Sequence, residues 1–341
     1  MEEKKILVVL GAGKGQRMES LSEEYSKVAY PILDKPLVNY VLDAAKPLGF
    51  DKSFVVVGFG GNQTIKCVGD RANIVWQKEV NGTGGAIMCV LPEIKEDEGV
   101  MFILCGDTPL LTTSTLEKIY HKHIKYNNKL TICSTVLANP EGYGRVIREQ
   151  GSYRVLEVRP YAEISEEEKE LNEINSGIYI VDIKLLKEFL PQLSRENKKN
   201  EYYLSDIVKL FADAGHSVGA YVLEDPQDIY NINDRVQLAY AAKIMRRRIN
   251  HRLMLSGVSV EDPDTIYISP DTVIGKDTVI KPNTTILGDC VIGEGNIIGP
   301  GSFLKHVKVG NRNRIHICQL RNTEVGDDEI IEPYTVRTPK C

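Results

Sequence analysis

The sequence predicts an α/β fold with a mixed, mostly parallel sheet, followed by a short parallel β-helix. Short apolar runs alternate with amphipathic stretches over residues 5–225, and one long helical pattern follows. Apolar pairs then recur every six residues from about residue 265. Alternating strands and helices are typical of a sheet covered on both faces, and a six-residue period is typical of stacked hexapeptide coils.

The first region is predicted from its buried strands. Four β-rich runs are predicted as strands, at 6–10, 54–57, 101–104 and 178–181. Amphipathic stretches at 36–48 and 84–91 lie between the first three runs and predict helices. Because the runs are continuously apolar rather than alternating, we expect strands that are buried on both faces.

The second region begins after a helix predicted over 234–255, which stops at Gly257. One apolar residue of each six is predicted to point inward, at 274, 280, 286, 292, 298 and 304. Glycines 275, 293 and 299 follow such residues, where we expect turns that need a residue without Cβ strain. The register slips after Leu304, and the segment supplies only about four coils. We therefore expect domains at 1–232 and 258–341, joined by a linker helix at 233–257.

Composition narrows the class of protein. The chain has 341 residues and a net charge of −5, which gives no general reason to expect nucleic-acid binding. It has no signal-peptide pattern and no apolar stretch long enough for a membrane span. Its seven cysteines are scattered, without a CxxC pair, so neither a disulfide framework nor a zinc site is indicated. We expect a cytoplasmic protein.

A glycine-rich segment follows the first predicted strand, with the sequence Gly-Ala-Gly-Lys-Gly-Gln-Arg-Met over 11–18. It is neither a dinucleotide fingerprint nor a P-loop, because Gln16 and the missing Gly-Lys-Ser/Thr break those patterns. Its backbone N–H groups can still cradle an anion, and Arg17 and Lys27 add positive charge. A tight turn with solvated cations is the alternative at this point.

These residues resemble the signature of sugar-phosphate nucleotidyltransferases, a Rossmann-like fold. Later motifs, in the same order, are similar to one branch of that family: the bifunctional N-acetylglucosamine-1-phosphate uridylyltransferases / glucosamine-1-phosphate acetyltransferases (GlmU). The resemblance covers almost the whole chain and implies that its β-helix is left-handed. It also implies that Arg17 and Lys27 bind phosphates. The implied nucleotide-binding residues are Leu10, Ala12, Gly13, Gln77, Gly82 and Thr83.

The resemblance further implies a sugar site and a metal site. Gly144, Glu157 and Asn175 match the residues that touch the sugar, and Asp107 and Asn233 match two ligands of Mg²⁺. Asp107 follows a predicted parallel strand, at the sheet edge where α/β proteins bind ligands. One carboxylate and one amide oxygen suit Mg²⁺, which completes its shell with phosphates and water. A turn cap before Thr108-Pro109 is the other interpretation of Asp107.

Several positions depart from the family pattern. Gln16 stands in place of Thr, Gly85 in place of His and Cys105 in place of an aromatic residue. Val158-Arg159-Pro160 follows Glu157 where the family usually has a Lys-Asp pair. The last departure weakens the prediction of the sugar, whereas the predicted metal and phosphate ligands are all present.

The resemblance implies uridylyl transfer from UTP to N-acetylglucosamine 1-phosphate, giving UDP-N-acetylglucosamine and pyrophosphate. Alternatives are another sugar 1-phosphate or dTTP, as in a glucose-1-phosphate uridylyl- or thymidylyltransferase. Alternatives of another class are a hexapeptide-repeat acyltransferase and a non-catalytic nucleotide-sugar scaffold. We expect acetyltransferase activity to be absent, because the family's acetyltransferase residues are not assignable. The β-helix is expected to support a homo-oligomer, a trimer by analogy.

Overall fold

The computed structural model describes residues 3–19 and 25–338. Cys341, one of the seven cysteines, lies outside the described residues. The chain groups into two compact units: Met1–Tyr30 with Leu37–Arg235, and Pro31–Pro36 with Val236–Cys341. A short hairpin near the amino terminus therefore belongs to the second unit. The domain boundaries at 232/233 and 257/258 stay predictions.

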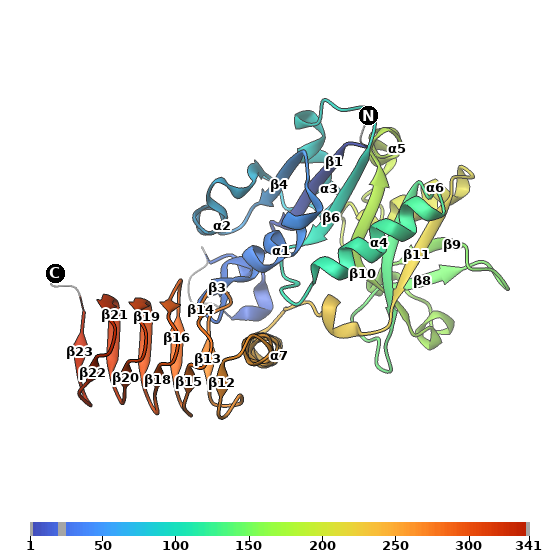
Figure 1. The fold of residues 1–341 in the computed structure, drawn as a ribbon. Coiled ribbons are helices and arrows are strands. Elements are labelled where there is room, and N and C mark those ends of the chain that lie inside the picture. The colour runs from blue at the N-terminus through green and yellow to red at the C-terminus, as the bar shows by residue number, and fades with distance from the viewer. Residues whose placement is uncertain (1–2, 20–24, 339–341) are drawn as a thin grey trace. The chain divides into compact units, whose positions relative to one another are not determined.

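Among the described residues, nine strands form the sheet of the first unit (Figure 1). They are β1 (Lys5–Gly11), β4 (Lys52–Val57), β5 (Asn73–Trp76), β6 (Val100–Cys105), β7 (Leu130–Val136), β8 (Arg145–Arg148), β9 (Val155–Arg159), β10 (Glu173–Asp182) and β11 (Val218–Leu223). The main order is β11-β7-β10-β6-β1-β4-β5. β1 pairs in parallel with β4 and β6, whereas β10 is antiparallel to β6 and β7. The predicted mixed, mostly parallel sheet is confirmed.

Helices cover both faces of this sheet, as the continuous apolar strands predicted. They are α1 (Leu37–Ala45), α2 (Gly61–Val68), α3 (Thr83–Val90), α4 (Thr113–Lys125), α5 (Ile183–Phe189) and α6 (Ile207–Asp213). Successive β1 residues point to opposite faces. Ile6 packs in one core with Ile87 of α3, and Leu7 packs in the other core with Val41 of α1.

The strand order reverses beside β1. The chain first builds β4 and β5 on one side of β1 and then returns to place β6 on the other side. Ligands of open α/β sheets bind outside the carboxyl ends of the strands at such a switch point. The ends of β1, at Gly11, and of β6, at Cys105, therefore mark the expected site.

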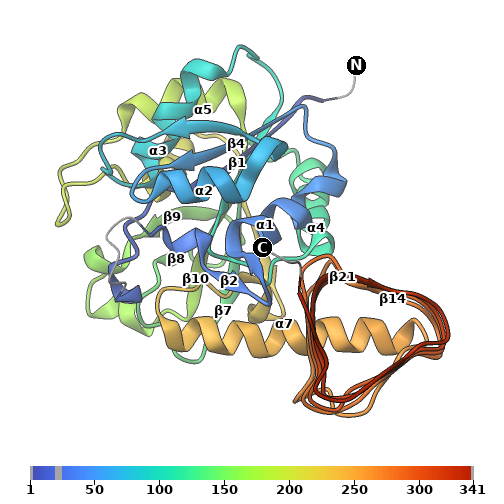
Figure 2. The same ribbon diagram turned by 90° about the vertical axis from the view of Figure 1, so that its left-hand side faces the viewer.

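The second unit contains most of α7 (Arg235–Leu255) and a parallel β-helix. The β-helix strands are β12 (Ser259–Val260), β13 (Tyr267–Ile268), β14 (Val273–Ile274), β15 (Val279–Ile280), β16 (Thr285–Leu287), β17 (Val291–Ile292), β18 (Ile297–Ile298), β19 (Phe303–Val309), β20 (Arg314–Ile315), β21 (Gln319–Val325), β22 (Ile330–Ile331) and β23 (Val336–Arg337). Figure 2 shows the coils superimposed as a three-sided outline. The long predicted helix is confirmed by α7.

The strand register confirms the six-residue period. Val279 pairs with Ile297, and Thr285 pairs with Phe303, so one coil takes three hexapeptides. Phe303 then pairs with Gln319, which shortens the coil and confirms the slip predicted after Leu304. The six residues predicted to point inward are all buried.

The prediction that a turn requires glycine was wrong for two of the three positions. Gly299 has the positive φ of a turn, but Gly275 and Gly293 do not. A Cβ on Gly275 would lie 2.7 Å from the carbonyl oxygen of Gly293, and a Cβ on Gly293 would lie 2.6 Å from that of Gly310. These glycines allow neighbouring coils to stack closely, rather than allowing a turn.

Candidate active site

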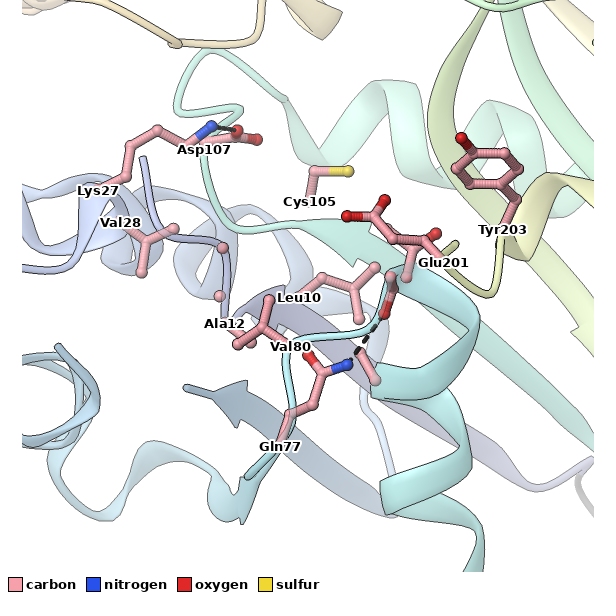
Figure 3. A pocket seen from close by; sticks show the side chains of 15 residues that line it. Leu10, Ala12, Lys27, Val28, Gln77, Val80, Cys105, Asp107, Glu201 and Tyr203 are labelled. Atoms are coloured by element: carbon pink, nitrogen blue, oxygen red, sulfur yellow. Dashed lines mark hydrogen bonds and ion pairs between the residues drawn. The ribbon is translucent and has the colours of Figure 1, made fainter. Parts of the chain in front are cut away.

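A cavity of about 410 Å³ lies at the switch point of the first unit (Figure 3). All six residues predicted to bind the nucleotide line it, together with Lys27 and Asp107. The lining residues are Leu10, Gly11, Ala12, Gly13, Lys27, Val28, Gln77, Val80, Gly82, Thr83, Ala86, Cys105, Asp107, Glu201 and Tyr203. Segments that follow β1, β5 and β6 thus converge, as the strand order dictates.

The floor of the cavity is formed where β1 and β6 end. The amide of Gly106 donates a hydrogen bond to the carbonyl oxygen of Leu10 at 2.9 Å. A Cβ at position 106 would also lie 2.9 Å from that oxygen, so a larger residue would push the strand ends apart. Glycine at this position holds the β1 loop and Asp107 close together.

Lys27 connects the two predicted metal ligands at one end of the cavity. It lies in a 3₁₀ turn, η2 (Lys27–Ala29), and its Nζ forms an ion pair with Asp107 Oδ2. The same Nζ donates to Asn233 Oδ1 at 3.2 Å. The oxygens of Asp107 and Asn233 therefore converge on one positive charge, in a position that suits a cation.

Asn231 was missed by the sequence interpretation. Its Nδ2 donates to Asp107 Oδ1 at 3.1 Å, and the amide of Ile232 donates to the carbonyl oxygen of Asp107 at 3.0 Å. These two bonds hold the segment that carries Asn233 against the end of β6. Spacing alone gave no signal for Asn231, because its partner is distant in the chain.

Arg17 is exposed on η1 (Gln16–Met18) and does not line the cavity. It is near enough to Tyr143 for its charge to lower the pKa of that phenol, although burial and Asp107 raise this pKa overall. The structure therefore brings Lys27 to the cavity and leaves Arg17 on the surface.

Gln77 is fixed at the opposite side from the Lys27–Asp107 pair (Figure 3). The side chain is buried, and its Nε2 donates to the carbonyl oxygen of Gly82 and to Asn81 Oδ1, both at 3.0 Å. Both amide protons are thus used, which leaves Oε1 as an acceptor. The Gly85 departure has a physical reason here, since a Cβ at 85 would lie 1.8 Å from Asn81 Oδ1.

The three residues predicted to touch the sugar do not line this cavity. The backbone amide of Asn175 donates to the carbonyl oxygen of Gly144 at 3.0 Å, and its Nδ2 donates to the Tyr179 hydroxyl at 2.7 Å. Glu157 forms an ion pair with Arg159, with a shortest distance of 3.1 Å. Gly144 and Asn175 are therefore brought together. Glu157 is instead held by Arg159, which belongs to the Val-Arg-Pro segment that departs from the family pattern.

Glu157 lines a second cavity of about 360 Å³, which shares Tyr203 with the first. Asp206 also lines this second cavity. Burial, and then the negative charge of Glu157, raises the pKa of Asp206 to about 6. Glu201, Tyr203 and Asp206 were missed by the sequence interpretation. The glycine-rich loop and the metal motif lie far from them in the chain and gave no signal.

Two other side chains have environments that restrict their chemistry. Cys105 lines the cavity, and burial, followed by the charge of Asp107, raises the pKa of its thiol to about 12. The thiol is therefore neutral and a weak nucleophile. The polar residues around His121 and His123 predict a solvated helix face. His123 is instead buried, with Nδ1 2.9 Å from Thr131 Oγ1. Burial lowers the pKa of His123 to about 4.

Neither a cluster of metal-ligating side chains nor a membrane-spanning helix occurs among the described residues. No group of three or more His, Cys, Asp or Glu side chains among them is arranged to hold a metal ion. No described helix is long and apolar enough to cross a membrane.

Comparison with known families assigns both regions. The family model of nucleotidyl transferases matches residues 6–242. The model of the bacterial transferase hexapeptide, with six repeats, matches residues 271–306. The solved structure of a UDP-glucose pyrophosphorylase complexed with UDP-glucose superposes with a TM-score of 0.59 at 19% identity, over 72% of this chain and 99% of that chain. At this identity the likeness concerns the fold alone.

Curated relatives match nearly the whole chain. The bifunctional protein GlmU of Geobacillus sp. (strain WCH70) is 40% identical over 97% of this chain and 71% of its own length. The bifunctional protein GlmU of Caldanaerobacter subterraneus subsp. tengcongensis is also 40% identical, over 99% of this chain and 73% of its own. The one from Listeria monocytogenes serotype 4a is 36% identical over the same shares. The chain belongs to the nucleotidyl transferase family, in its GlmU branch.

Proposed function

We propose that the chain transfers a uridylyl group from UTP to N-acetylglucosamine 1-phosphate, giving UDP-N-acetylglucosamine and pyrophosphate. The observation that carries the proposal is one cavity with two chemically different ends. Lys27 converges with Asp107 and Asn233 at one end, and a hydrogen-bonded Gln77 lies at the other. Cationic and oxygen ligands suit phosphates with their metal, and an oriented amide suits a base.

Gln77 favours uracil over cytosine. Both protons of its Nε2 are engaged, so Oε1 is the group left to meet the base. An acceptor at that position suits the N3–H of uracil or thymine, whereas N3 of cytosine is itself an acceptor. Cytosine would leave the buried Oε1 of Gln77 without a donor, and such an unpaired group discriminates strongly against a substrate. This reasoning supports UTP, and leaves dTTP as the alternative nucleotide.

The triphosphate would lie along the loop after β1. Backbone N–H groups around Ala12 and Gly13 can position its oxygens, and Lys27 supplies positive charge within the cavity. We assign Arg17 to the outer phosphates, because it is exposed beside this loop. The long side chain of Arg17 can reach phosphates that extend beyond the cavity.

The residues present fit a divalent metal ion. Asp107 and Asn233 offer two oxygens that already share one positive charge, that of Lys27. We propose Mg²⁺, which commonly binds one or two protein oxygens and completes its shell with phosphate and water. When bound there, Mg²⁺ would neutralise the phosphate charge that develops during transfer. Lys27 would then turn from the two oxygens to the phosphates.

The sugar would bind beside Gly144 and Asn175, with Tyr203 between the two cavities. Glu157 contacts a sugar hydroxyl only if its ion pair with Arg159 rearranges. Asp206, with its raised pKa, lies in the same cavity. This region decides the sugar, so glucose 1-phosphate stays an alternative to N-acetylglucosamine 1-phosphate.

The chemistry needs no general base, because the attacking sugar phosphate is already an anion. Its oxygen attacks the α-phosphorus of UTP in line, and pyrophosphate leaves. Catalysis then depends on positioning and on charge neutralisation by Lys27 and Arg17. The neutral Cys105 thiol takes no part as a nucleophile.

The β-helix is assigned a supporting role. We propose that it assembles copies of the chain as a homo-oligomer, and a trimer is the form to test by light scattering. The absence of acetyltransferase activity stays a prediction, and the word bifunctional in the names of the relatives stands against it. Release of free CoA from acetyl-CoA, above background and dependent on glucosamine 1-phosphate, would overturn that prediction.

The proposal is tested by pyrophosphate release with Mg²⁺ across a panel of nucleotides and sugar phosphates. The nucleotides are UTP, dTTP and CTP, and the acceptors are N-acetylglucosamine 1-phosphate and glucose 1-phosphate. UTP with N-acetylglucosamine 1-phosphate should give the largest kcat/KM. A higher kcat/KM with glucose 1-phosphate or dTTP would show that this compound is the preferred substrate. No pyrophosphate release with any pair would favour the non-catalytic scaffold.

A further inference from the structure

The hairpin of β2 (Pro31–Ile32) and β3 (Lys35–Pro36) belongs to the second unit, although the chain on both sides belongs to the first. The amide of Leu37 donates to the carbonyl oxygen of Tyr30 at 3.0 Å, so the hairpin leaves and returns at one point. Only residues 28–30 separate the hairpin from Lys27. The hairpin therefore lies directly next in the chain to the segment that carries Lys27.

The two-residue turn of this hairpin has an unfavourable backbone. Leu33 and Asp34 have φ angles of 48° and 68°. A turn with two positive φ angles normally uses Asn and Gly, whereas a bulky residue such as Leu rarely adopts this conformation. Such a conformation persists only where surrounding contacts hold it.

Three contacts with the β-helix hold the turn, and we name them the hairpin clamp. Asp34 Oδ1 forms an ion pair with Lys305 Nζ at 2.8 Å, and Lys35 Nζ forms one with Asp271 Oδ1 at 2.8 Å. The hydroxyl of Ser269 donates to the carbonyl oxygen of Leu33 at 2.7 Å. Both residues of the turn, and the lysine that follows them, thus contact the β-helix.

Ser269, which makes the central contact of the clamp, also takes part in a contact between stacked coils. Ser269 is buried, and its Oγ also accepts a hydrogen bond from the amide of Gly288, in the next coil, at 3.0 Å. Its hydroxyl therefore joins two coils to the Leu33 carbonyl. Lys305 lies on β19, which continues the face formed by β13 and β16. The clamp uses rigid positions of the β-helix.

On the other side of the hairpin, η2 forms part of the cavity wall. Val28 lines the cavity beside Lys27, and it is buried like Ala29. The amide of Tyr30 donates to the carbonyl oxygen of Lys27 at 3.3 Å. One short, hydrogen-bonded turn thus connects the hairpin to Lys27 along the chain.

We infer that the hairpin clamp positions Lys27 for the phosphates of UTP, so that Asp34 and Lys305 are positioning residues of the transferase reaction. The inference rests on the proposed function for the identity of the nucleotide. The clamp gives the β-helix a role in catalysis through the chain, without any β-helix residue touching the substrate. Single surface ion pairs contribute little to global stability, so the loss of one should act locally.

The variants for the test are Asp34→Asn, Lys305→Gln, their double variant and Lys305→Arg. Asn tolerates a positive φ, so Asp34→Asn removes the charge without changing the turn. The matched control is Lys308→Gln, on the same strand, which breaks an ion pair with Glu324 that lies outside the clamp. The measurements are kcat and KM for each substrate, and hydrogen exchange of the amides of Ala29, Tyr30 and Leu37.

Asp34→Asn and Lys305→Gln should each lower kcat/KM for UTP about fivefold. The double variant should lower it by the same factor, because all three variants remove the same ion pair. The KM for the sugar phosphate should not change, and Lys305→Arg and Lys308→Gln should match the original chain. The three amides should exchange faster only in the clamp variants. Unchanged kcat/KM and exchange, or an additive double variant, would overturn the inference. If the original chain has no transferase activity, the proposed function fails, and the exchange measurement alone still decides whether the clamp restrains η2.

Discussion

The two units use glycine for close approach in opposite ways. In the first unit, Gly106 lets the ends of β1 and β6 meet and leaves a cavity above them. In the second, Gly275 and Gly293 stack directly on the carbonyl groups of the next coil. The first arrangement leaves backbone and charged side chains facing a cavity, whereas the second fills the space with more protein.

We infer from this difference that the first unit carries out the chemistry and that the β-helix mainly supports it. The sheet places different side chains at the ends of neighbouring strands, so Lys27, Asp107 and Asn233 meet although they are far apart in the sequence. The β-helix repeats one environment in every coil, and its residues mainly contact their equivalents in the next coil. We expect substitutions of the charged residues at the cavity of the first unit to change activity at constant stability. Substitutions between the stacked coils, outside the hairpin clamp, should change stability at constant activity.

The largest effect is expected at Asp107. Asp107→Asn keeps a side-chain oxygen but removes the negative charge that a metal ion needs, so turnover should fall by about 100-fold or more. Stability should be unchanged in urea unfolding followed by the fluorescence of Trp76, the single tryptophan, which lies in the first unit. The control is Asp97→Asn, which removes an exposed carboxylate of the same unit. Near-normal turnover in Asp107→Asn would end the metal assignment.

The converse effect is expected at Gly293. A Cβ there would lie 2.4 Å from Asn311 Oδ1 and 2.6 Å from the Gly310 carbonyl oxygen. Gly293→Ala should therefore lower the free energy of unfolding of the β-helix by about 1–3 kcal/mol. Circular dichroism should show an earlier transition in urea, while Trp76 fluorescence should not shift. The control is Glu294→Ala at the exposed neighbouring position. An unmoved dichroism transition would show that the coils tolerate the extra atom.

A smaller effect is expected on metal binding itself. Lys27 places a positive charge between the oxygens of Asp107 and Asn233, where it competes with a metal ion. Lys27→Met should therefore tighten Mn²⁺ binding in the absence of nucleotide by roughly tenfold, although the variant loses activity. Titration calorimetry measures this directly, with Lys78→Met at an exposed site as control. Weaker Mn²⁺ binding in Lys27→Met would show that the lysine supports the site instead of competing for it.

The smallest effect concerns pH. The pKa of Asp206 is raised to about 6 from its ordinary value of 3.8, chiefly by burial. The folded state therefore holds this proton more tightly, and the free energy of unfolding falls as pH rises from about 4 to about 6. Asp206→Asn should raise that free energy at pH 7 by about 1–2 kcal/mol, after allowance for solvent screening, and should have no effect below pH 4. Urea unfolding at both pH values checks this.

The pH control is Asp213→Asn, an exposed carboxylate that lines the same cavity. It should leave the free energy of unfolding unchanged at both pH values. If Asp206→Asn destabilises the first unit at pH 7, the carboxylate is ionised and stabilised there, and the pKa assignment is wrong.

The regular parts of both units were predictable from the sequence. Continuous apolar runs predicted β1, β4 and β6, because strands buried on both faces need no polar alternation. The period of six predicted the inward residues 274–304 and the slip that follows. All six predicted nucleotide-binding residues line the cavity, because they lie in short segments next to recognisable strand ends.

The remaining features depend on contacts between distant residues. The hairpin clamp joins positions 236 and 271 residues apart, and neither Asp34 nor Lys305 carries a local signal. Pairing with Arg159 holds Glu157, which the family pattern could not indicate because the arginine is itself a departure. The burial of His123 was missed because the polar sequence around it does not reveal which side of α4 meets the sheet.

³¹P nuclear magnetic resonance tests most directly whether the cavity transfers a uridylyl group. The chain is mixed with UTP, N-acetylglucosamine 1-phosphate and Mg²⁺, beside an identical sample of Asp107→Asn. We predict that the signals of UTP and the sugar phosphate are replaced by those of a sugar-linked diphosphate and pyrophosphate, far faster in the original chain. Formation of UDP and inorganic phosphate, or equal product formation in both samples, would contradict the account.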